Sequence, residues 1–247
     1  MAVLDHPSMS TEAPGVTHTL GVIASGNVAG FVAGLIAGGV GSRLAMRIMA
    51  LTSPDAQGDM TEAGEVVGEI SLDGTGFLLA VGALLGIGGG LAYVALRRWL
   101  PRRATGLVFG LLTLAVSGRV LVDPDNIDFA ILDPASLGIA MFAALPILFG
   151  LLVVPLQASL EPFFTKTRSR LATTLILIAG LLPLAIGGPL AVGLAILVAA
   201  GFLLARSSTV RDVWATSTVD IYGRALLGAA GVFGLGYFAW GALEILV

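Results

Sequence analysis

The stretch GNVAGFVAGLIAGGVGS, residues 26–42, decides how this chain folds. Glycine stands at every fourth position, and the series is Gly26, Gly30, Gly34 and Gly38, continued by Ser42. Residues four apart lie on the same face of a helix. Glycine costs an exposed soluble helix about 1 kcal/mol relative to alanine, so four glycines on one face need a compensating contact. In a lipid bilayer, that contact is the close approach of a second helix.

The composition of the whole chain indicates the same environment. Its 247 residues are 56% hydrophobic and only 12% charged, with a mean hydropathy of +0.96, whereas a typical soluble domain is about 25% charged. Several apolar stretches reach the length of about 20 residues that a helix needs to cross a bilayer. We therefore predict an all-α, polytopic transmembrane helix bundle. The seven predicted spans are residues 20–50, 77–96, 107–122, 135–156, 171–186, 189–205 and 225–247. The alternative count is six full spans plus a short re-entrant hairpin within 171–205.

The distribution of charge predicts the orientation of the bundle. Lys and Arg concentrate in the connections 97–103, 166–170 and 206–224, which fall on one side of a seven-span protein. Acidic residues concentrate in the connections 55–73 and 123–133 on the other side. Because Lys and Arg mark the cytoplasmic side, the N-terminus is predicted inside and the C-terminus outside. The predicted organisation is a mobile polar tail over 1–18 and one bundle domain over 19–247, with an interfacial cytoplasmic segment over 206–224.

The glycine series predicts which helices pack closely. A second small-residue series, Ala29, Ala33, Ala37 and Gly41, runs beside the first. The second predicted span repeats the four-residue interval with Gly82, Gly86 and Gly90. We expect the first span to pack against the second span, the seventh span or the same helix of another copy. A glycine-lined pore is the remaining interpretation.

Three arginines lie on the same side as the acidic connections. Arg43 and Arg47 share one helix face, and Arg119 lies about 18 Å into the third span. The acidic segment 52–76 is predicted as an outer loop with a short amphipathic helix near residues 59–70. We predict that its carboxylates fold onto the arginines, as structural salt bridges or as a site for an anion, such as a lipid headgroup, or for a divalent cation. The predicted cluster is Arg43, Arg47, Arg119, Glu62, Glu65, Glu69, Asp123, Asp125 and Asp128.

The chain lacks the residues that several classes of membrane chemistry require. The chain has no cysteine, and its two histidines, His6 and His18, lie in the N-terminal tail. Haem and metal centres inside the membrane therefore lack their usual ligands, and no cofactor or metal is predicted. The lone lysine, Lys166, is in a connection, which disfavours a retinal Schiff base. The basic residues form no continuous stripe, so nucleic-acid binding is not expected.

Four motifs carry a resemblance to a known group of proteins. They are GVGSRLAMRIMALTSP (39–54), TEAGEVVGEI (61–70, followed by GT at 74–75), YVALRRWLP (93–101) and DPDNIDF (123–129). Over residues 20–165 the chain resembles uncharacterised bacterial multi-pass membrane proteins. The resemblance implies a bacterial plasma (inner) membrane location and implies no catalytic residue.

Three functions remain open on these observations. The leading hypothesis is a non-enzymatic membrane protein that acts as a homo-oligomer or as an accessory subunit of a larger membrane complex, through glycine-mediated helix packing. The second is a transporter or lipid-handling protein with its site at the arginine and carboxylate cluster. The third is a membrane enzyme that uses the outer carboxylates for acid–base chemistry.

Overall fold

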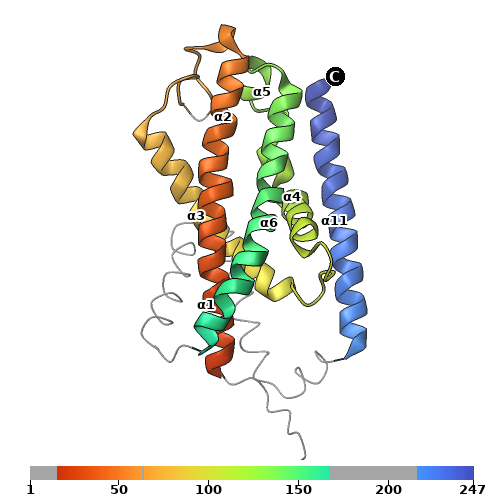
Figure 1. The fold of residues 1–247 in the computed structure, drawn as a ribbon. Coiled ribbons are helices and arrows are strands. Elements are labelled where there is room, and N and C mark those ends of the chain that lie inside the picture. The colour runs from red at the N-terminus through yellow and green to blue at the C-terminus, as the bar shows by residue number, and fades with distance from the viewer. Residues whose placement is uncertain (1–15, 63, 167–215) are drawn as a thin grey trace, which may run out of the picture.

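The computed structural model describes residues 16–62, 64–166 and 216–247, which form an all-helical bundle (Figure 1). The predicted spans over 171–186 and 189–205, the tail over 1–15 and most of the interfacial segment 206–224 lie outside the described residues. The elements are α1 (Val16–Gly34), η1 (Leu35–Val40), α2 (Gly41–Thr52), η2 (Pro54–Ala56), α3 (Leu72–Leu96), α4 (Thr105–Leu121), α5 (Asp128–Ile131), α6 (Ala135–Lys166) and α11 (Ser217–Leu246).

Four helical segments in the described residues are long and apolar enough to cross a membrane. They are His18–Thr52, Leu72–Leu96, Ala135–Lys166 and Ser217–Leu246. Helix α4, the predicted third span, is shorter, with 17 residues, or about 26 Å at 1.5 Å per residue. The chain is thus an all-helical protein with four candidate membrane-spanning helices in the part that the structure describes.

The first span is one continuous helical segment with a wider π turn in its middle. The π-helical turn η1 separates α1 from α2, and such turns interrupt the regular face pattern of an α-helix. Here two consecutive glycines on the turn both face α3. A Cβ added at Gly38 would lie 2.9 Å from the Cα of Gly82, and one at Gly39 would lie 3.0 Å from the Cα of Leu79.

Helices α1 and α3 pack backbone to backbone through their glycines. A methyl group added at Gly30 would overlap the carbonyl oxygen of Gly86, and one added at Gly90 would overlap that of Gly26. A Cβ at Gly34 would lie 2.6 Å from the Cα of Gly86. The glycines of the first span therefore face the second span of the same chain, and the small side chain is what permits this approach.

The neighbouring face of α1 and η1 packs into the core of the bundle. Ala29, Ala33 and Ala37 are buried there in one apolar cluster with the aromatic rings of Tyr93 and Phe109. The two rings meet edge to face with their centroids 5.3 Å apart, a geometry that aromatic pairs prefer. One helix thus presents glycines to α3 and alanines to larger side chains from α3, α4 and α6.

Glycine also mediates the packing of α4 on α6, although the sequence analysis did not single out these glycines. A Cβ at Gly110 would lie 2.8 Å from the Cα of Ile147. A Cβ at Gly150 would lie 2.5 Å from the Cα of Gly110 and 2.5 Å from the carbonyl oxygen of Gly106. Close backbone contact is therefore a general device of this bundle.

Helix α11 lies at the edge of the bundle (Figure 1) and is fastened to it at both ends. Asp220 accepts a hydrogen bond from Nε of Arg98 at 2.9 Å, and Glu244 pairs with Arg119 at 3.3 Å. Between these ion pairs, a Cβ at Gly234 would lie 2.7 Å from the Cβ of Ala115 on α4. We call the end of the bundle at Arg98 the basic end. The opposite end, where Arg119 lies beside the acidic connections, is the acidic end.

The prediction of an amphipathic helix near residues 59–70 is wrong. This segment is a loop closed by an antiparallel bridge between Met60 and Val66. Gly58, Gly64 and Gly68 have positive φ angles of 94°, 77° and 90°, which lie outside the right-handed helical region and which glycine adopts readily. Glu62, Glu65 and Glu69 therefore do not share a helical face.

The glycine contact between α1 and α3 predicts a stability difference between two glycines of α3. Gly86→Ala should lower the free energy of unfolding by about 1–3 kcal/mol, because the new methyl group overlaps the backbone of Gly30. The measurement is an SDS titration of the purified protein followed by circular dichroism.

Gly76→Ala is the matched control on the same helix, since a Cβ there meets nothing within 4 Å. Its effect should stay within about 1 kcal/mol and be neutral or stabilising. Equal loss of stability in the two variants would contradict the close approach of α1 and α3.

Candidate functional site

The two arginines of α2 hold the acidic loop through its backbone. Nη2 of Arg43 donates a hydrogen bond to the carbonyl oxygen of Ser71 at 3.1 Å, and Nη1 of Arg47 donates to that of Gly68 at 2.9 Å. Their partners are thus carbonyl groups just before α3. The hydrogen bonds fix the point at which the chain re-enters the bundle.

Arg119 contacts a different set of groups. It lies in the last turn of α4 and pairs with Asp123 and Glu244, each at 3.3 Å. Its guanidinium carbon lies 5.5 Å from the ring centroid of Tyr237, within the range of a cation–π contact. Glu244, which was not among the predicted residues, makes Arg119 a link between α4 and α11.

The predicted carboxylates divide into bonded and exposed groups. Glu65 accepts a hydrogen bond from the hydroxyl of Ser71 at 2.6 Å, next to the start of α3. Asp128 accepts one from the backbone N–H of Glu62 at 2.9 Å and so joins two loops. Glu69 and Asp125 are exposed at the surface.

The two loops at the acidic end form a cap, defined here as residues 53–71 and 122–134. The Ser53 hydroxyl donates to the carbonyl oxygen of Asp133 and accepts from its N–H, both at 2.8 Å. A cavity of about 320 Å³ lies beneath the cap, and Glu62, Asn126 and Asp128 are its polar lining residues. Arg43, Arg47 and Arg119 do not line it. The structure therefore brings Glu62 and Asp128 together but places the three arginines on separate partners.

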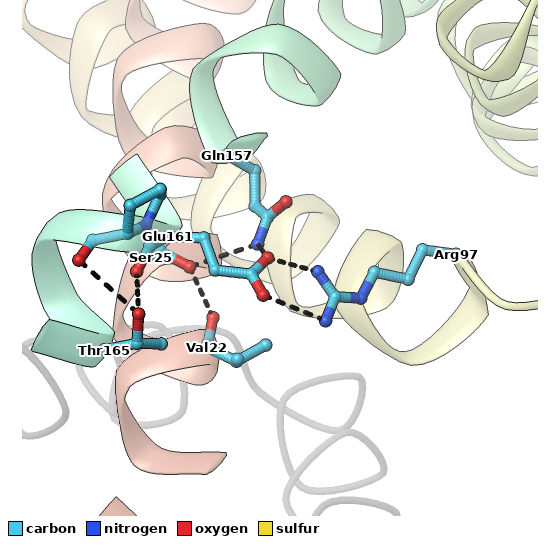
Figure 2. A network of polar contacts seen from close by, with 7 residues as sticks. Val22, Ser25, Arg97, Gln157, Glu161 and Thr165 are labelled. Atoms are coloured by element: carbon cyan, nitrogen blue, oxygen red, sulfur yellow. Dashed lines mark hydrogen bonds and ion pairs between the residues drawn. The ribbon is translucent and has the colours of Figure 1, made fainter. Parts of the chain in front are cut away.

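A buried polar network at the basic end was missed by the sequence analysis (Figure 2). Ser25 of α1 and Gln157 of α6 are 0% and 2% exposed. Nε2 of Gln157 donates to the hydroxyl of Ser25 at 3.2 Å and to Oε2 of Glu161 at 2.7 Å. Glu161 in turn forms a two-pronged ion pair with Arg97, which follows α3.

This network joins three helices at one level of the bundle. The Ser25 hydroxyl donates to the carbonyl oxygen of Val22 at 2.7 Å, so it both accepts and donates. A buried polar group without a partner is costly in an apolar medium, and here each side chain of the network has at least one. The network therefore links the middle of α1, the end of α3 and the last turns of α6 with polar contacts.

The sequence did contain a signal for this network. Gln157 and Glu161 are four residues apart and so share a helix face. The predicted fourth span stopped at residue 156, just before the first of these polar residues, whereas α6 continues to Lys166. Treating Gln157 and Glu161 as one face of a longer helix indicates a polar partner on a neighbouring helix.

A double-mutant cycle tests the contact between Ser25 and Gln157. The free-energy changes of Ser25→Ala and Gln157→Leu should be non-additive by about 0.6 kcal/mol, the typical strength of an interhelical hydrogen bond in a membrane. Unfolding in SDS measures each variant. Ser159→Ala combined with Gln157→Leu is the control, because Ser159 donates within its own helix, and additive behaviour is expected there. Additivity in the Ser25 cycle would contradict the network.

In comparisons with known proteins, no family model, no curated protein and no solved structure matches this chain. Its function is therefore inferred from its own residues.

Proposed function

We propose that this chain is a non-enzymatic integral membrane protein that acts as a subunit of an assembly, most simply an oligomer of identical copies. Four candidate membrane-spanning helices support the membrane location. The polar residues at both ends support a structural role, because Ser25, Gln157 and Arg119 each join one helix to another. The proposed function thus lies in the surface that the bundle presents.

The observation that carries the assembly proposal is the outward face of α11. The glycine face of the first span is closed by α3 within one chain, so a second copy needs a different surface. On α11, Phe233 and Trp240 are 78% and 64% exposed. Gly236 lies between them, and a Cβ there would meet nothing within 4 Å. A small residue flanked by aromatic rings is a suitable point for a second helix to approach.

The two other predicted functions have less support. A lipid-handling or transport site at Arg43, Arg47 and Arg119 needs these groups on one cavity, and they contact separate partners. An enzyme needs a poised acid or base, and Glu65 is occupied in a hydrogen bond with Ser71. Loss of an activity in Asp125→Asn with the fold intact would favour an enzyme.

The proposed orientation places the basic end in the cytoplasm and the cap outside. The acidic loop precedes α3, and Arg97 follows it directly. The 25 residues of α3 therefore separate the acidic loop from Arg97 by about 38 Å. Lys and Arg are retained on the cytoplasmic side of a membrane. Helix α6 ends and α11 begins at the basic end, which is compatible both with two further spans and with a re-entrant hairpin between them.

Cysteine labelling tests this orientation directly, because the chain has no cysteine of its own. A single cysteine at Asp59 should react with a membrane-impermeant maleimide added to intact cells. One at Arg103 should react only after the cells are opened. Labelling of both positions in intact cells, or the reverse order, would contradict the proposed orientation.

Native mass spectrometry in mild detergent tests the assembly. The wild-type protein should show two or more copies, and Gly236→Phe should reduce the assembled fraction severalfold, because the ring holds a second helix away. Val116→Phe is the control on α4, where the side chain is also exposed, and it should leave the assembled fraction unchanged. A wild-type protein that is entirely monomeric would contradict the proposal.

A further inference from the structure

A long groove lies between α4 and α11 on the half of the bundle nearer the basic end. Its cavity volume is about 1020 Å³, at the upper limit of typical ligand pockets, which are about 300–1,000 Å³. Its walls along the two helices are apolar. They include Leu111 and Leu112 from α4 and Leu227, Val232 and Leu235 from α11. A ligand that lies along these walls must therefore be largely hydrocarbon.

The mouth of the groove is strongly basic. Arg97, Arg98, Arg102 and Arg224 line it, together with a single carboxylate, Asp220. Asp220 is bonded to Arg98, and Arg97 is paired with Glu161. The side chains of Arg102 and Arg224 are exposed and form no ion pair within the described residues. The mouth thus has an excess of positive charge for which the described part of the chain supplies no counter-charge.

The length of the groove corresponds to one leaflet of a bilayer. Asp220 at the mouth and Leu235 at the far end are 15 residues apart on α11, and both line the groove, which is about 22 Å along the helix. Half of a bilayer with its headgroups is also about 20–22 Å thick. Trp99 lines the mouth. Tryptophan is enriched at the level of the lipid headgroups, so its position agrees with a mouth at that level. The charged mouth and the apolar walls therefore correspond to headgroup and acyl chain.

We propose that this groove binds an anionic phospholipid from the leaflet at the basic end. The phosphate binds Arg102 and Arg224, because guanidinium groups form strong charge-assisted hydrogen bonds with phosphate. One acyl chain lies along the leucine side chains of α4 and α11. A free anion would fill only the mouth and leave the apolar walls without a partner. This site is independent of the proposed assembly and lies at the opposite end from the arginines that the sequence analysis singled out.

The headgroup half of the proposal is tested by lipid titration. The purified protein in mild detergent is mixed with phosphatidylglycerol or phosphatidylcholine, and bound lipid is counted by native mass spectrometry. Phosphatidylglycerol should bind about tenfold or more tightly than phosphatidylcholine. Arg102→Gln and Arg224→Gln should each weaken its binding about fivefold. Arg103→Gln is the matched control, since Arg103 is exposed in the same connection but does not line the groove, and it should bind like the wild type.

The acyl-chain half is tested by filling the groove. Gly228 lines it, and a Cβ there would meet nothing within 4 Å, so Gly228→Phe places a ring in the groove without a clash at its Cβ. This variant should lose about tenfold or more in phosphatidylglycerol binding. Val116→Phe, at an exposed position of α4 outside the groove, should retain wild-type lipid binding. Circular dichroism and gel filtration verify that each variant is folded.

Three outcomes would overturn the proposal. One is equal affinity for the two lipids, and another is equal loss of binding in Arg102→Gln and Arg103→Gln. The third is a combined result: Gly228→Phe binds phosphatidylglycerol like the wild type, and equimolar inorganic phosphate displaces the lipid. This result would indicate a site for an anion only. The same spectra report the number of copies, so a change in assembly with Gly236→Phe is distinguished from a change in lipid binding with Gly228→Phe.

Discussion

The close backbone contact between α1 and α3 is the constraint on which the other contacts depend. Gly30 and Gly86 meet with no room for a methyl group between them, and this fixes the depth and register of the two antiparallel helices. Once α3 is held in that register, the residues just before it lie within reach of Arg43 and Arg47, and the arginine that follows it lies within reach of Glu161. A shift of α3 along α1 by one turn, about 5.4 Å, would break all of these contacts.

The ion pairs at the two ends of the bundle add a constraint that the glycine contacts do not supply. Dispersion between small-faced helices is strong only at close range, and it does not select one end over the other. In both the Arg98–Asp220 and the Arg119–Glu244 ion pair, the carboxylate belongs to α11 and the arginine to the α3–α4 part of the chain. Together they hold α11 along α4 at both levels, although this helix has few buried residues of its own.

The sequence predicted the parts of the structure that follow from local patterns. The four-residue interval at Gly26–Gly38 and Gly82–Gly90 predicted close packing, and hydropathy predicted the apolar helices, because both patterns repeat along one helix. The end of α6 was not predicted, since Gln157 and Glu161 have their partners, Ser25 of α1 and Arg97 after α3, in distant parts of the sequence. The spacing of the glutamates in residues 59–70 fits a helix, but glycines with positive φ at positions 58, 64 and 68 give this segment the path of a loop. Contacts between distant residues, such as Arg119 with Glu244, leave no periodic signal in the sequence.

The same physical rule accounts for both the tight contacts and the groove between α4 and α11. The two helices touch where Gly234 meets Ala115, two residues with little or no side chain. Nearer the basic end, their facing positions include Leu111, Leu112 and Leu227, whose side chains line a cavity. Where small residues face each other the backbones close on one another, and where leucines face each other the helices leave space that hydrocarbon can fill. Glycine on one helix alone does not close the gap, since Gly228 lines the groove. The pairing of small residues across the two helices therefore determines where α4 and α11 meet and where they leave the groove.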